Sequence, residues 1–184
     1  IADTREFLKP ELSDFSDVEL GSFLAHADMR VRMRAQFELV KRGAAELLVR
    51  ATEAGQQLQR IHGIWGLGQL ARSEENLLPV LVTLLHDDDG EVRAQAAKVL
   101  GDTRSALAGE ALLGALEDES SRVKSFAAIG VGKCGMPTAL PKLIEILAEN
   151  NNRDVFLRHA CVQGMWGLNE REKMLKETKH ESGA

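Results

Sequence analysis

The chain has 184 residues, of which 44% are hydrophobic and only 4% aromatic, and its formal charge is −5. This length suits one domain or one repeat array with a real core. The core must be built from Leu, Val and Ala rather than rings, which disfavours β-sandwiches and barrels and favours close-packed helices. The acidic balance gives no global attraction to nucleic acid, and no apolar run is long enough to span a membrane.

A repeated pattern is the main signal in the sequence. Segments that begin at Leu24, Leu85 and Leu116 align without gaps: Leu precedes Val by seven residues, an acid lies between them, a base follows the Val, and Ala comes three residues later. Weaker copies lie at residues 59–63 and 156–160. The central small residues are Ala35, Gly63, Ala96, Ala127 and Ala160, at spacings of 28, 33, 31 and 33 residues. Such a period predicts about one helix pair per repeat.

The predicted helices alternate along the chain. First helices are expected at 17–25, 44–54, 76–85, 109–116 and 139–148, and second helices from about Val31, Gln59, Val92, Val123 and Phe156. Ser16 with Glu19 predicts a capping box and Ser73 an N-cap. Pro79 and Pro141 suit first turns, where a missing N–H costs little.

The second helices carry a small residue with Leu or Val four positions later, which places both on one core-facing side. Glycines that suit helix ends are Gly43, Gly101, Gly132 and Gly135, and the pairs Gly66/Gly68 and Gly130/Gly132 suit close packing. The predicted fold is all-α, an α-α superhelix of about five helix pairs. Expected repeats are 16–43, 44–72, 73–104, 105–136 and 137–169, with a polar helix or truncated sixth repeat at 170–184, in a single array over 1–184.

The repeats share the consensus L-x-x-L-L, followed by an acidic turn and then by V-R-x-x-A-x-x-x-L-G. Over about residues 17–168 this consensus resembles HEAT repeats, including the short lyase-type units. The resemblance implies a solenoid in which the turn acid and the base of neighbouring repeats form a hydrogen-bonded ladder. The matching residues are Asp28, Arg32, Asp89, Arg93, Asp118 and Lys124. Lys124 departs from Arg and would bond as a point charge rather than as a planar fork.

Several phrases resemble a narrower family, among them the residues around Val31, Trp65 and Val92 and the Arg158-His159-Ala160 triplet. They are similar to the HEAT segment of large bacterial membrane-bound dehydrogenase-like, haem-binding proteins of planctomycete type. This resemblance implies an extracytoplasmic spacer between a β-propeller and a cytochrome c domain. The chain itself contains no C-x-x-C-H motif, so the resemblance implies the spacer rather than the redox centre. Residues 179–184 resemble the turn before Val92, so we expect a fragment of a longer array.

The residues that could carry chemistry do not assemble into a known site. His62 and His159 are equivalent positions three repeats apart and cannot share a metal, and neither precedes a Glu, as in HEAT-fold di-iron hydroxylases. No catalytic triad, phosphate-binding loop or metal spacing is visible. Cys134 and Cys161 form no C-x-x-C pair and suit buried apolar positions. We therefore expect no cofactor, no metal and no enzymatic activity.

Each second helix carries a further stripe of three residues. They lie one position before, two positions after and six positions after the central small residue. Its aromatic and basic members are typical of protein interfaces. The candidate partner-binding residues are Phe37, His62, Trp65, Lys98, Phe126, Ile129, His159 and Trp166. The first hypothesis is a scaffold that docks a protein, such as a neighbouring domain, on its concave face, and packing between repeats is the plain alternative. A free-standing cytosolic HEAT adaptor and a bilin lyase-like enzyme are the second and third hypotheses.

Overall fold

The computed structural model describes residues 12–168, and every regular element in this range is helical. The α-helices are α2 (Asp17–Phe23), α3 (Met29–Lys41), α4 (Ala45–Thr52), α5 (Gln57–Leu70), α6 (Leu78–Thr83), α7 (Gly90–Thr103), α8 (Ala106–Ala115), α9 (Ser121–Lys133), α10 (Leu140–Asn150) and α11 (Val155–Leu168). The 3-10 turns are η1 (Leu12–Asp14), η2 (Glu75–Leu77), η3 (Leu84–His86) and η4 (Pro137–Ala139). The prediction of an all-α array of helix pairs is confirmed. The polar helix expected after residue 169 lies outside the described residues.

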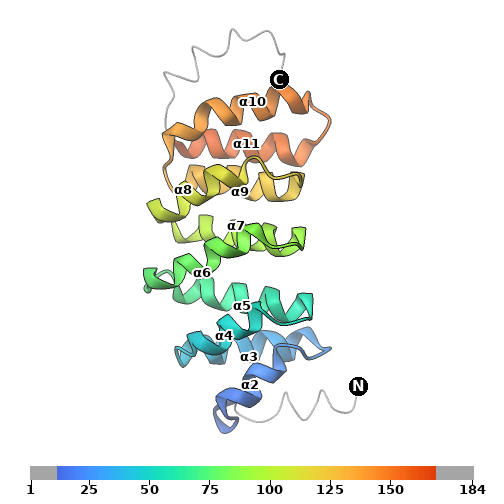
Figure 1. The fold of residues 1–184 in the computed structure, drawn as a ribbon, viewed down its shortest axis with the longest axis vertical. Helices are drawn as coiled ribbons and strands as arrows, with labels where there is room; N and C mark the ends of the chain where they lie inside the picture. The colour runs from blue at the N-terminus through green and yellow to red at the C-terminus, as the bar shows by residue number, and fades with distance from the viewer. Residues whose placement is uncertain (1–11, 169–184) are drawn as a thin grey trace. The chain divides into compact units, whose positions relative to one another are not determined.

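The chain forms two compact units, one up to Leu81 and one from Val82. In the first unit, α3 packs on α5, and α2 and α4 pack against them. In the second unit, α7, α9 and α11 lie side by side as one layer, with α8 against α7 and α9 and with α10 against α11 (Figure 1). The small residues of the second helices and the Leu or Val four positions later are buried, as their spacing predicts. Ala96, Leu100 and Val131, for example, have no exposed surface.

Local chemistry explains where the helices begin. Ser16 and Glu19 form the predicted capping box at α2. The second helices begin one or two residues earlier than predicted, because the turn residues before the repeated Val act as caps. Asp28 and Asp89 each accept a hydrogen bond at 2.8 Å, from the backbone N–H of Arg30 and Glu91 respectively. These carboxylates satisfy N–H groups that have no partner inside the helix.

The Ser73 prediction is wrong. The Ser73 hydroxyl donates to the Leu70 carbonyl at 3.1 Å, so it closes the end of α5 instead of opening the next helix. That helix is preceded by η2 and starts at Leu78, which puts Pro79 in its first turn as predicted. Pro141 has the same place in α10.

The glycines divide into two groups. Gly43 and Gly135 end helices with φ of 67° and 66°, as predicted. Gly101 and Gly132, also predicted at helix ends, lie inside α7 and α9 and serve helix contact instead. For Gly132 this confirms the close packing that was predicted for the Gly130/Gly132 pair. A Cβ atom on Gly101 would lie 2.6 Å from the Cα of Gly130, so the backbones of α7 and α9 meet directly at this point.

Candidate protein-interaction surface

Charged side chains of α7 and α9 pair with each other on the surface of the second unit. The Nε of Arg122 donates to Glu91 Oε2 at 2.7 Å, and Lys133 Nζ lies 2.6 Å from Asp102 Oδ1. Lys98 Nζ lies 3.1 Å from the other oxygen of Asp102. Lys98, a predicted partner contact, is therefore engaged in an ion pair within its own helix.

Two apolar members of the stripe lie on α9 between these ion pairs. Phe126 and Ile129 are both half-buried. The guanidinium carbon of Arg122 lies 5.2 Å from the centre of the Phe126 ring, within the range of a cation–π contact. These side chains leave part of their surface exposed and pack the rest against the unit.

The stripe on α11 has a different character, because it is mostly apolar and open. Trp166 is 72% exposed and Val162 50% exposed, and His159 is also exposed. Phe156, at 85%, and Val155 extend the surface at the start of the helix. The sequence reasoning did not select these last two. Val155 could have been predicted from the sequence. Residues 155, 159, 162 and 166 are four, three and four positions apart, and positions with this spacing share one helix face.

In the first unit the stripe is mixed. Phe37 is 51% exposed on α3, whereas Trp65 on α5 is half-buried. The His62 prediction is wrong, because this side chain is only 2% exposed and cannot reach a partner. His62 Nδ1 lies 2.8 Å from Gln36 Oε1, and its ring meets Trp65 edge-on at 5.0 Å between centroids. His62 is a buried polar residue that ties α5 to α3.

The environment of His62 favours its neutral form. Burial lowers the pKa of His62 to about 4, and the charge of nearby Arg32 acts in the same direction. A neutral imidazole can donate one hydrogen bond from Nδ1 to Gln36. This group therefore fits a structural contact better than acid–base chemistry near neutral pH.

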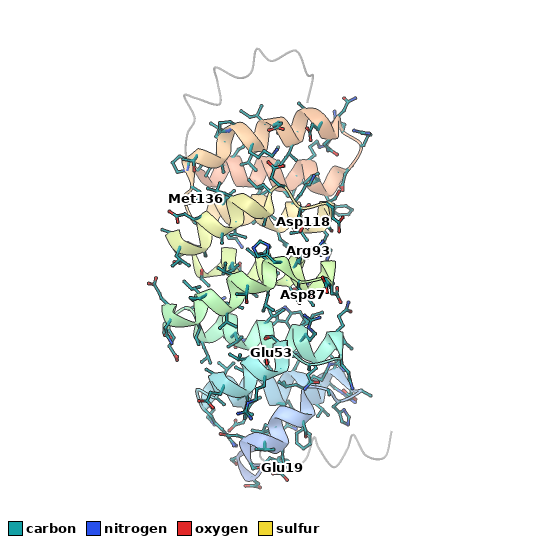
Figure 2. The ribbon with its side chains drawn as sticks, viewed as in Figure 1. Glu19, Glu53, Asp87, Arg93, Asp118 and Met136 are labelled. Carbon is teal, nitrogen blue, oxygen red and sulfur yellow. The ribbon has the colours of Figure 1, made fainter. Side chains whose placement is uncertain are left out.

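The ladder residues form one inter-repeat rung in the second unit. The Nε and Nη2 atoms of Arg93 lie 2.7 and 3.1 Å from the two carboxylate oxygens of Asp118 (Figure 2). The same guanidinium donates to the carbonyls of Asp87 and Asp88. Burial raises the pKa of Asp118, but hydrogen bonds from Arg93 and from the Ser120 backbone outweigh it and hold the pKa below its usual value. The planar fork thus joins the turns of two successive repeats.

The other ladder positions behave differently. Asp28 pairs with Arg30 at 2.7 Å instead of with an Arg of another repeat, because it caps α3 and Arg30 lies two residues further on, in the first turn of that helix. Arg32 points back to the carbonyls of His26 and Ala27, at 2.6 and 2.8 Å. Asp89 caps α7. Lys124 makes no side-chain hydrogen bond or ion pair within residues 12–168, although its charge helps to lower the pKa of Asp118.

Within the described range, no group of three or more His, Cys, Asp or Glu side chains could hold a metal ion. Nor does any helix in that range have both the length and the apolar character that a membrane crossing requires. Both cysteines are free thiols, and burial raises the pKa of Cys161 to about 11. Such a thiol is a poor nucleophile at neutral pH.

Comparison with known proteins bears directly on this architecture. The family model for HEAT repeats matches residues 44–116 and 78–166, which together cover most of the chain. The chain belongs to the HEAT-repeat family. No curated protein sequence matches it significantly.

Solved HEAT and armadillo structures have the same fold. A chain from the CpcE–CpcF complex of phycocyanin lyase of Nostoc sp. PCC7120 superposes with a TM-score of 0.66 at 21% identity, covering 92% of this chain and 69% of that one. A designed armadillo repeat protein superposes at 0.56 and 17% identity, with coverages of 89% and 88%. Human deoxyhypusine hydroxylase gives 0.55 and 16%, with coverages of 83% and 62%. At these identities the likeness shows the fold alone.

Proposed function

We propose that this HEAT-repeat chain is a non-catalytic scaffold that docks a protein partner on the exposed stripe of its second helices. The observation that carries the proposal is the concentration of large apolar side chains on α11, where Phe156 and Trp166 are mostly exposed. Aromatic side chains of this kind supply most of the binding energy in protein interfaces. HEAT arrays present such helices as extended binding surfaces.

The partner surface is best defined on α11 and on the neighbouring half-buried residues of α9. Phe126 and Ile129 lie on α9, which packs directly against α11. The charges that flank them on α9 are already paired with α7. A partner can therefore cover this area without separating an ion from its counter-ion, which would oppose binding.

Site-specific photo-crosslinking in the native organism tests the docking surface. A photo-reactive amino acid at Val162 should give a discrete adduct, and the same residue at Leu107 is the matched control. Leu107 is 52% exposed on α8, almost equal to Val162, but lies outside the second-helix layer. The adduct should disappear when Trp166 is replaced by alanine. Equal crosslinking from both positions, or none from Val162, would contradict the proposal.

We further propose that the parent protein is a large extracytoplasmic redox protein and that this segment is a spacer for its domains. The phrases around Val31, Trp65 and Val92 support this origin. Reading the parent gene tests it directly. A signal peptide, a propeller domain and a downstream C-x-x-C-H motif are expected. Their absence would leave the free-standing HEAT adaptor as the better description.

A phycocyanin-lyase-like enzyme is the alternative of another class, and only the shared fold supports it. Mixing the chain with phycocyanobilin and recording the absorption spectrum separates the two. A scaffold leaves the bilin spectrum unchanged, whereas a lyase-type binding groove should shift it.

A further inference from the structure

A polar hollow of about 380 Å³ lies in the second unit, where the start of α9 meets the connection from α10 to α11. Ile146 and Leu157, both largely buried, provide its apolar lining. Lys124 lines it from α9, Glu149 from α10, and Asp154 from the residue that precedes α11. A hollow of this volume holds a small ligand or the ends of two side chains.

The hollow occurs where the ladder between repeats is interrupted. Val92-Arg93 and Val123-Lys124 are equivalent steps of the repeat. Arg93 meets Asp118 of the following turn directly, at 2.7 Å. The turn that follows Lys124 carries an asparagine insertion instead, with Asn151 and Asn152 at positive φ. No carboxylate of that turn comes within ion-pair distance of the Lys124 ammonium among the described residues.

The remaining polar groups of this turn are engaged in holding the turn itself. Asp154 Oδ1 accepts from the backbone N–H groups of Phe156 and Leu157, at 2.9 and 3.0 Å. Arg153 donates to the carbonyls of Asn150 and Glu149. The Glu149 carboxylate, like the Lys124 ammonium, has no hydrogen bond or ion pair within residues 12–168. One cation and one anion thus line the same hollow without meeting.

We propose that this hollow is a binding site for a mixed-charge segment of a protein partner, which presents a carboxylate to Lys124 and a cationic side chain to Glu149. The charge of Lys124 acts on Asp118 without touching it, and Glu149 is exposed. Such a segment gives each of these side chains a direct contact partner at once, whereas a simple anion would be repelled by Glu149 and Asp154. Its aliphatic stems would cover Ile146 and Leu157. The choice of a protein as the source rests on the proposed scaffold function.

Nuclear magnetic resonance titration of the full ¹⁵N-labelled chain tests the site with a defined probe. The probe is an acetylated and amidated tetrapeptide, Gly-Glu-Lys-Gly. We expect saturable shifts at Ser121, Lys124 and residues 149–157. The variant Lys124→Met should weaken binding by about tenfold, as loss of one charge contact does. Lys124→Arg should retain binding, and Lys41→Met, which removes an exposed charge from α3 in the first unit, is the matched control.

Titrations with other ligands test which charges the site recognises and whether the ligand is a protein segment. A Gly-Gln-Lys-Gly peptide should bind wild type as weakly as Gly-Glu-Lys-Gly binds Lys124→Met. Absence of shifts at the hollow, or equal binding to wild type and Lys124→Met, would overturn the site. Equal or tighter binding of free glutamate would overturn the protein segment as its source. Trp166→Ala should leave peptide binding unchanged, so failure here is distinguishable from failure of docking on α11.

Discussion

Replacing Gly101 with alanine tests whether direct backbone contact between α7 and α9 holds the second unit together. The new Cβ would lie 2.6 Å from Gly130 Cα, a separation that no ordinary carbon contact tolerates. Neither atom belongs to a flexible side chain, so the two helices must move apart. Alanine alone would favour the helix by about 1 kcal/mol, whereas overpacking of this kind typically costs about 1–3 kcal/mol. We expect a net loss of up to about 2 kcal/mol.

Gly114→Ala is the matched control, because it makes the same chemical change in the same unit. Gly114 lies in α8, is exposed, and a Cβ there would meet nothing within 4 Å. This variant should gain up to about 1 kcal/mol from helix propensity. Since both variants gain the same helix propensity, they should differ in the free energy of unfolding by the overpacking cost, about 1–3 kcal/mol.

Urea denaturation followed by circular dichroism measures the difference. Hydrogen exchange read by mass spectrometry should place the loss in α7 and α9, because arrays of repeats can open locally before they unfold. Equal stability of Gly101→Ala and Gly114→Ala would refute the claim that these helices meet through their backbones.

Three further predictions concern buried polar groups. Arg93→Met leaves Asp118, whose side chain is 10% exposed, without its ion-pair partner, and should lower the free energy of unfolding in urea by about 3 kcal/mol. Arg93→Lys should cost less, because lysine keeps the charge but not the planar fork. The pKa of His62 is about 4 in the folded chain, whereas an unfolded histidine takes up its proton near pH 6.5. The contribution of neutral His62 to the free energy of unfolding is therefore fully present above pH 6.5, and it falls by up to about 3 kcal/mol as the pH drops towards 4. Denaturation at several pH values should show this slope in the wild type and a smaller slope in His62→Gln. Cys161 should resist iodoacetamide at pH 8 in the folded chain while Cys134 reacts, and both should react equally in urea, as mass spectrometry can record.

The repeat pattern predicted the helices and the core because both depend on local spacing. Ala96 and Leu100 are buried as a pair four residues apart must be when one helix face packs inward. The starts of the second helices were displaced by one or two residues, since the caps are turn residues that lie before the repeated Val. Among the first helices, α8 begins at Ala106, three residues before the predicted start. Gly101 was placed at a helix end, and Gly132 was assigned to both roles, because a glycine late in a helix suits either a helix end or a close contact. Only the neighbouring helix decides between them.

The two equivalent histidines show what repeat spacing leaves undetermined. His62 and His159 occupy the same position of their repeats, yet one is buried and the other exposed. The preceding second helix accounts for the difference. Gln36 on α3 accepts a hydrogen bond from His62, whereas the residue equivalent to Gln36 on α9 is Ala128, which packs against the backbone of Gly164. A position can be predicted from the repeat, but its burial depends on a side chain one repeat away.

The charges at the edges of the second-helix layer change systematically along the second unit. The acids Glu91 and Asp102 on α7 have as their repeat equivalents Arg122 and Lys133 on α9, and these four residues form the two ion pairs between the helices. The next equivalents, on α11, are the apolar Val155 and Trp166.

Since the bases of α9 are already neutralised by α7, a partner on α11 meets mainly apolar surface, and its affinity should depend little on salt. Binding at the hollow beside Lys124 relies on charges and should weaken as salt screens them. Titrating a purified partner and the Glu-Lys peptide at low and high ionic strength separates the two surfaces. A strong salt dependence of the interaction that Trp166→Ala abolishes would contradict an apolar docking surface on α11.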